Sequence, residues 1–148
     1  MEVNPFDDIY FMKESIKEAK KAFEKDEVPV GCVIVCNNQI IARAYNFTQR
    51  LNDATAHAEM QAFTSAADFL GGKYLNECTL YVTLEPCLMC AGAAYWTQLK
   101  KIVFGTYDSK MGYSQFIENA LHPKTEVIGG IMEKECAKLL TDFFKLKR

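Results

Sequence analysis

The chain lacks the features that mark membrane, secreted and fibrous proteins. No apolar run approaches the roughly 20 residues that span a bilayer. The N-terminal segment MEVNPFDDIY is acidic and has no apolar signal core. Internal repeats, low-complexity tracts and Gly/Ser-rich linkers are absent as well. We therefore expect no membrane association, a cytoplasmic location and one domain over residues 1–148.

Excess basic charge and histidine are also missing. Lys and Arg number 17 against 19 Asp and Glu, so any nucleic-acid contact must come from a local patch. The only histidines are His57 and His122, and we expect His122 to be a loop residue without a role. Cysteine, by contrast, is plentiful. Six cysteines in a chain expected in the cytoplasm indicate metal binding or catalysis rather than disulfides.

The spacing of apolar residues predicts alternating helices and strands. Steps of three and four from Ile9 predict an amphipathic helix that stops before Pro29. Two β-rich runs, 30–36 and 39–45, flank Asn37-Asn38 and predict an antiparallel hairpin. The other expected elements are a loop at 46–55, a helix at 56–70, a strand at 78–84, a helix with Pro86 at its first position reaching Thr97, strands at 101–104 and 126–128, and a helix at 132–144. This order indicates an α/β domain layered around one sheet.

Cys87 and Cys90 form the core of a candidate metal site. They lie three residues apart at an expected helix start, which places both sulfurs on one face and favours thiolate. Two such thiolates are half of a zinc site, and Cys32 and Cys36 have the wrong spacing to complete it. His57 is the natural third ligand. Three protein ligands leave one tetrahedral position for water, so we expect one catalytic zinc per chain.

Glu59 lies two residues after His57. A carboxylate beside zinc-bound water can take a proton and pass it on. In a regular helix residues two apart point to nearly opposite faces, so His57 and Glu59 converge only if the first turn is irregular or lines a pocket from both sides. A Cys-x-x-Cys pair also suits a redox protein, and a binding module with structural zinc is a third class. The joint pattern His-x-Glu followed by Pro-Cys-x-x-Cys is the signature of zinc nucleobase deaminases.

With these motifs the sequence resembles the cytidine/deoxycytidylate deaminase superfamily, and within it the bacterial tRNA wobble-adenosine deaminases. The likeness covers nearly the whole chain and rests on the stretches Glu27–Gly31, Ala44–Asn46, Thr55–Glu59, Cys78–Cys87, Met89–Ala93, Val103–Gly105 and Phe143-Phe144 with its basic tail. It implies a three-layer α/β fold with a central mixed five-stranded sheet between helices. It further implies a homodimer that converts adenosine to inosine in a tRNA anticodon loop, where zinc-bound hydroxide attacks the base and ammonia leaves.

The resemblance also implies roles for particular residues. His57, Cys87 and Cys90 would bind zinc, and Glu59 would shuttle protons. Asn46 would hydrogen-bond the flipped base, Val30, Ala58 and the Glu85-Pro86 backbone would border the pocket, and Asp108, Lys110 and Phe144 would lie near the RNA. Taken alone, Asn46 is also typical of a turn and Lys110 of a solvated surface, and Phe143 and Phe144 could both lie in the core at helical spacing. Tyr95-Trp96 is similar to the purine-base deaminases, so a free-base or nucleoside deaminase acting on guanine or cytosine stays open.

Overall fold

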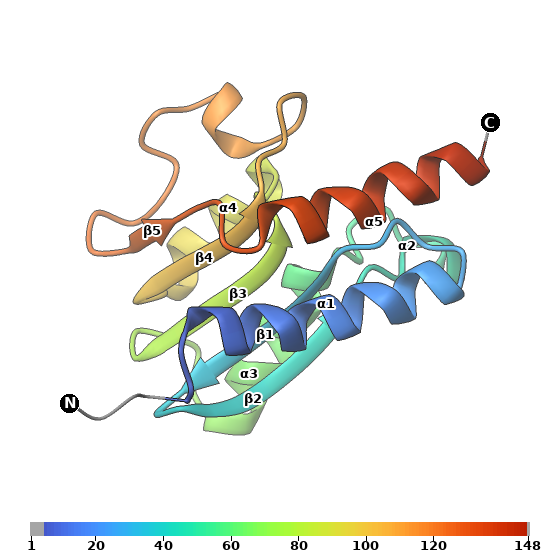
Figure 1. Ribbon diagram of the computed structural model, residues 1–148. Coiled ribbons are helices and arrows are strands. Elements are labelled where there is room, and N and C mark those ends of the chain that lie inside the picture. The colour runs from blue at the N-terminus through green and yellow to red at the C-terminus, as the bar shows by residue number, and fades with distance from the viewer. Residues whose placement is uncertain (1–4, 148) are drawn as a thin grey trace.

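A mixed five-stranded sheet forms the centre of the molecule (Figure 1). The computed structural model describes residues 5–147. The strands are β1 (Gly31–Cys36), β2 (Gln39–Tyr45), β3 (Cys78–Leu84), β4 (Lys101–Thr106) and β5 (Glu126–Ile128), in the order β2-β1-β3-β4-β5. β1 pairs antiparallel with β2 and β3, whereas β3, β4 and β5 run parallel. The expected mixed sheet of five strands is therefore confirmed.

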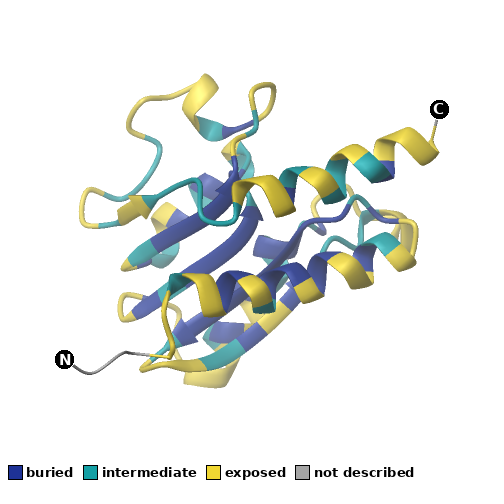
Figure 2. Cartoon of the chain, in the orientation of Figure 1, coloured by how far each residue is buried: buried dark blue, intermediate teal, exposed yellow. Residues whose placement is uncertain are grey.

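Helices cover both faces of the sheet. α1 (Asp8–Glu24) and α5 (Glu133–Leu146) lie side by side on one face, and α3 (Ala58–Leu70) and α4 (Leu88–Thr97) cover the other (Figure 1). Successive residues of β1 enter opposite core clusters, since Ile34 packs beneath α3 and Val33 beneath α1. The inner strands are accordingly buried on both faces (Figure 2). No helix within residues 5–147 has both the length and the apolar character needed to cross a bilayer.

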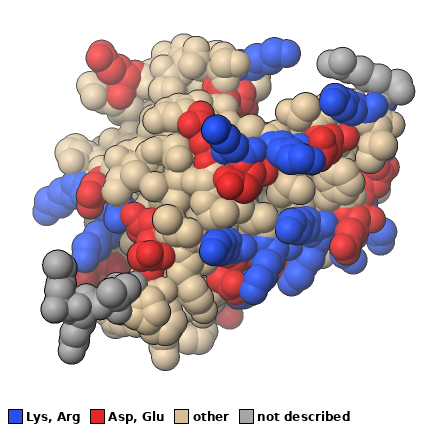
Figure 3. All heavy atoms as spheres, in the orientation of Figure 1, with Lys and Arg blue, Asp and Glu red and all other residues tan. Residues whose placement is uncertain are grey.

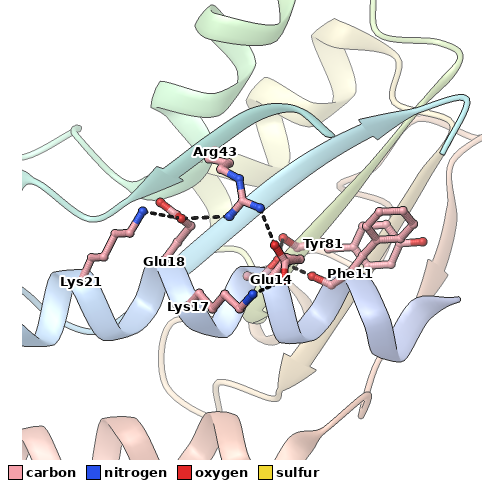
Figure 4. A network of polar contacts seen from close by, with 8 residues as sticks. Phe11, Glu14, Lys17, Glu18, Lys21, Arg43 and Tyr81 are labelled. Carbon is pink, nitrogen blue, oxygen red and sulfur yellow. Dashed lines mark hydrogen bonds and ion pairs between the residues drawn. The ribbon is translucent and has the colours of Figure 1, made fainter. Parts of the chain in front are cut away.

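Polar contacts fix α1 to the sheet (Figure 4). Arg43 on β2 forms ion pairs with Glu14 and Glu18 of α1, the latter at 3.1 Å. The Ser15 hydroxyl donates a hydrogen bond of 2.8 Å to the Tyr81 carbonyl on β3. Glu18 is almost fully buried, so its charge depends on this pairing and on a second ion pair, with Lys21 at 2.9 Å. Together these contacts set the position of α1 along β2 and β3.

Gly31 allows α1 to lie directly against the first residue of β1. A Cβ atom at this position would lie 2.2 Å from the backbone nitrogen of Ala19. The Gly31 N–H donates to the Thr83 hydroxyl on β3 at 3.1 Å. The start of β1, which leads directly to the functional site, is therefore fixed from the helix and from the neighbouring strand.

Most predicted elements are confirmed, and the differences lie at helix starts and in loops. Asn37 and Asn38 adopt φ values of 52° and 61°, as a tight hairpin turn requires. Pro86 is not the first helical residue, because Cys87 keeps extended backbone as the N-cap and α4 begins at Leu88. The segment 46–55, expected as a loop, contains the short helix α2 (Thr48–Leu51). His122 lies in irregular backbone, as expected.

Candidate metal centre

Two helix N-termini meet at the site. His57 is the N-cap of α3 and Cys87 is the N-cap of α4, with extended ψ values of 154° and 172°. Cys90 lies in the first turn of α4. Because His57 precedes the first helical residue, its side chain does not follow the helical rotation that would carry it away from Glu59. His57 and Glu59 can therefore belong to one site although they are two positions apart. The extended backbone of His57 is the irregularity that such convergence requires.

The three candidate ligands converge on one point. His57 Nδ1 lies 3.5 Å from Cys87 Sγ and 3.6 Å from Cys90 Sγ, and the three atoms lie within 4.8 Å of one another. A tetrahedral zinc with bonds of about 2.3 Å to sulfur and about 2.0 Å to nitrogen separates these ligand atoms by about 3.6 Å. The donor set therefore fits zinc in type and spacing. Within residues 5–147 no other group of three His, Cys, Asp or Glu residues has such geometry.

The two sulfurs differ in their electrostatics. The Cys90 thiol donates a hydrogen bond to Cys87, and this bond together with His57 lowers the pKa of Cys87 to about 4. The same hydrogen bond and burial raise the pKa of Cys90. The bond to Cys87 also raises the pKa of His57. Cys87 is therefore the thiolate of the pair, and a cation bound between the two sulfurs would also deprotonate Cys90.

Glu59 is buried against the metal centre. Only 3% of its surface is exposed, and burial raises the pKa of its carboxyl to about 7. A hydrogen bond from its own backbone N–H and the positive charge of His57 oppose this rise, whereas the negative charge of Cys87 adds to it. A carboxyl in such surroundings can hold and release a proton near neutral pH, as a general acid or base must.

Known proteins resemble the chain in sequence and in fold. The family model of the cytidine and deoxycytidylate deaminase zinc-binding region matches residues 6–106. The tRNA-specific adenosine deaminase of Bacillus subtilis is 48% identical over 143 residues, covering 93% of this chain and 89% of that protein. A structure from work on A-to-I editing by tRNA:A34 deaminases at the wobble position of transfer RNA is 39% identical, with a TM-score of 0.82, covering 88% of this chain and 99% of that chain.

The chain belongs to the tRNA-specific adenosine deaminases. It is thus a nucleobase-deaminating enzyme of the cytidine and deoxycytidylate deaminase family. A guanine deaminase structure from Bacillus subtilis is also similar, at 34% identity and a TM-score of 0.65, but it covers only 71% of this chain. The greater identity and coverage of the tRNA deaminases decide the branch of the family.

In this deaminase Asn46 connects the end of β2 to the start of α3. Its Oδ1 accepts the Ala58 N–H at 2.9 Å, and its own N–H donates to the Val30 carbonyl at 3.1 Å. Val30 and Ala58 are buried beside it. The structure thus brings three residues predicted for the pocket together. With the Asn46 oxygen engaged, the side chain has its two amide N–H donors left for a ligand.

Glu27 holds the segment that follows Asn46, a function that the sequence analysis missed. The carboxylate is fully buried and accepts the Gln49 N–H at 3.0 Å, the Arg50 N–H at 2.9 Å and the Thr48 hydroxyl at 3.4 Å. These bonds organise α2, which lies between Asn46 and His57. The one sequence signal is an acidic residue four positions before the buried strand β1.

Glu85 holds the opposite wall in the same way. Its carboxylate is buried and accepts the Asp108 N–H at 3.2 Å, the Ser114 N–H at 3.1 Å and the Ser114 hydroxyl at 2.6 Å. A Cβ at Gly112 would lie 2.4 Å from the carboxyl carbon of Glu85, so the loop packs tightly on it. The Pro86 carbonyl accepts a further N–H from this loop. The predicted pocket residues Glu85 and Pro86 are thus engaged in shaping the wall.

Two cavities share Met111 as a lining residue. The first, of about 480 Å³, is lined by His57 and Cys87 together with Ala54, Leu88, Met89, Met111 and Phe116. The second, of about 670 Å³, brings together Asp108, Lys110 and Phe144, the residues predicted to lie near RNA. We call the second the nucleotide cavity. Phe143 instead packs against Phe23 in the interior, with ring centroids 5.7 Å apart.

Proposed function

We propose that this enzyme hydrolyses adenosine to inosine at the wobble position of a tRNA anticodon loop, with water consumed and ammonia released. The observation that carries the proposal is the 48% identity to a tRNA-specific adenosine deaminase across 93% of the chain. The convergence of His57, Cys87 and Cys90 beside Glu59 supports the chemistry. A tRNA substrate would place the enzyme, as one deaminase domain over residues 1–148, in the cytoplasm.

Zinc is the cofactor that the donor set favours. His57, Cys87 and Cys90 offer one nitrogen and two sulfurs, the ligands that zinc prefers, and would hold one ion per chain. When bound, zinc supplies a coordinated water of lowered pKa. The redox alternative for the Cys87-Cys90 pair does not explain why a histidine nitrogen lies at almost equal distances from both sulfurs.

Glu59 and Asn46 would act on protons and on the base. Glu59 would accept a proton from the attacking water and deliver one to the departing amino group, a task that its burial beside Cys90 supports. Asn46 would donate an amide N–H to an acceptor on the flipped nucleoside, because its oxygen is already bound to Ala58. Val30 and Ala58 would form the apolar floor beneath the base.

The nucleotide cavity would receive a neighbour of the edited base. Phe144 is 47% exposed there and offers a ring for base stacking. The exposed Lys110 ammonium would bind a phosphate. The Asp108 side chain accepts the Lys110 and Met111 N–H groups at 3.0 Å each, so its carboxylate supports this loop. Arg148, the last residue of the basic tail, lies outside the described residues.

A screen of ammonia release tests the proposed function. The substrates are an anticodon stem-loop with adenosine at the wobble position, the same stem-loop with inosine there, free guanine, cytosine and adenosine. We expect ammonia from the adenosine stem-loop alone, and about one zinc per chain by elemental analysis. Full activity on free guanine or cytosine with none on the stem-loop would contradict the proposal. So would a metal-free protein with a reversible Cys87–Cys90 disulfide.

A homodimer is part of the same proposal. α4 leaves Trp96 77%, Tyr95 40% and Leu88 39% exposed, and Phe69 at the end of α3 is 65% exposed. An exposed aromatic surface of this kind favours association with a second subunit. Light scattering at micromolar concentration should give twice the chain mass, and Trp96→Ser should shift it towards the monomer. A monomeric mass for the unaltered protein would refute the dimer.

A further inference from the structure

A separate basic pocket of about 490 Å³ lies beside the C-terminal end of α5. It is enclosed by the ends of α1 and α5 and by α2, which lie on the same side of the molecule (Figure 1). Its charged lining residues are Lys25, Asp26, Arg50 and Lys147. On the visible face, Lys and Arg side chains gather over α1 and towards the end of α5, with Asp and Glu between them (Figure 3). We call this cavity the basic pocket.

Two of its three cations are available to a ligand. Within residues 5–147, neither the Lys25 ammonium nor the Arg50 guanidinium forms an ion pair or a hydrogen bond, and both residues are exposed. Lys147 differs, because it forms an ion pair with Asp26. The unpaired charge of the pocket is therefore positive, which favours an anion.

Arg50 is anchored at its backbone. Its N–H donates to the buried carboxylate of Glu27 at 2.9 Å, and the preceding N–H, of Gln49, donates to the same carboxylate at 3.0 Å. A guanidinium on a fixed backbone loses less freedom when it binds, and its planar donors match phosphate in a bidentate manner. The negative charge of Glu27 is compensated locally by these N–H donors.

The basic pocket adjoins the nucleotide cavity. Val28 and Lys147 line both, so a chain that leaves one cavity meets the other. Phosphates of a single-stranded RNA follow one another along such a path. Resting on the proposed function, we propose that Lys25 and Arg50 bind a backbone phosphate of the anticodon loop, at a point beyond the nucleotide that occupies the nucleotide cavity.

Salt-dependent binding of the stem-loop tests this site. We compare the Lys25→Gln/Arg50→Gln double variant with Lys13→Gln/Lys134→Gln, which removes the same charge at the N-terminal parts of α1 and α5. Each lost phosphate contact lowers the slope of log affinity against log salt by about 0.7. For the one phosphate that the two cations share, we expect a slope lower by about 0.7 and binding about fivefold weaker at about 0.1 M salt. The control variant should keep the wild-type slope, and both variants should keep zinc and their melting temperature.

Two further variants sharpen the test. Arg50→Lys should keep the salt slope while losing part of the affinity, because lysine keeps the charge without the bidentate fork. Asp26→Asn should strengthen binding by freeing Lys147, and asparagine tolerates the positive φ of 62° at this position. The proposal would be overturned if the two double variants had the same salt slope, or if both lost the same amount of affinity for the stem-loop. If wild-type protein does not deaminate the stem-loop at all, the proposed function fails first, and the two failures are thus distinguishable.

Discussion

Three buried glutamates surround the site, and two of them differ from the third in what they bind. Glu27 and Glu85 accept hydrogen bonds from loop backbone N–H groups and from a hydroxyl. Glu59 is as deeply buried, but among the described residues no hydrogen bond joins it to either loop, and its carboxyl has a pKa of about 7. Burial alone therefore does not define the use of a carboxylate. Donors from a distant loop make a buried carboxylate a support for that loop, whereas Glu59, which accepts no hydrogen bond from either loop within residues 5–147, can exchange protons.

The largest effect is expected at Glu59. Glu59→Gln keeps the shape and removes the proton exchange, so kcat on the anticodon stem-loop should fall by at least about a hundred- to ten-thousand-fold. Zinc content and melting temperature should stay at the wild-type value, because no loop depends on this carboxylate. Glu77→Gln, the same change at an exposed position, should leave kcat, zinc content and melting temperature unaffected. An active Glu59→Gln enzyme would show that another group moves the proton.

Glu85→Gln should give the opposite pattern. An amide in place of the carboxylate turns an N–H₂ group towards backbone donors, and the tight packing of Gly112 prevents the loop from adjusting. The free energy of unfolding should fall by about 2–4 kcal/mol. KM for the stem-loop should rise more than kcat falls, because the nucleotide cavity is deformed. Urea unfolding and steady-state kinetics measure the two effects, with the exposed Glu126→Gln as control. Unchanged stability would mean that Glu85 does not hold the loop.

Glu27→Gln should have a smaller effect of the same kind. Its hydroxyl contact, at 3.4 Å, is longer than the 2.6 Å contact of Glu85, so about 1–3 kcal/mol of stability should be lost. Since Glu27 orders α2, hydrogen exchange at the Gln49 and Arg50 N–H groups should become faster. In Glu24→Gln, on the exposed side of α1, these amides should exchange as in wild type. Protection that persists in Glu27→Gln would refute its role.

The smallest effect is expected far from the site, at Arg43. The guanidinium is 37% exposed and water screens its ion pairs with Glu14 and Glu18, so Arg43→Gln should cost about 1 kcal/mol of stability. Activity and zinc content should not change, because α1 contacts the sheet on the face opposite the metal centre. Thermal unfolding at low and high salt measures the difference. A large loss of activity in Arg43→Gln would contradict this prediction and show that the α1 face of the sheet affects the metal centre.

Local patterns predicted the framework but not the walls of the site. The apolar spacing from Ile9 and the Asn37-Asn38 turn are local signals, and both elements form as expected. The Cys-x-x-Cys pair with His57 likewise indicated one site. The loops could not be predicted, because Glu27 and Glu85 act on backbone 22 and 29 residues away. Such distant hydrogen bonds also explain why α2 was expected to be an irregular loop.

The arrangement of His57 and Cys87 as caps of two different helices has a consequence for chain entropy. The two residues are 30 positions apart, so an ion held between them closes a loop containing all of α3 and β3. In the simplest entropic treatment, closing a loop of this length raises the free energy of the unfolded chain by about 3–4 kcal/mol, because the chain loses conformational entropy. The ion would thus act as a removable cross-link, and resistance of the folded enzyme to proteolysis would follow the free zinc concentration even in the absence of any RNA.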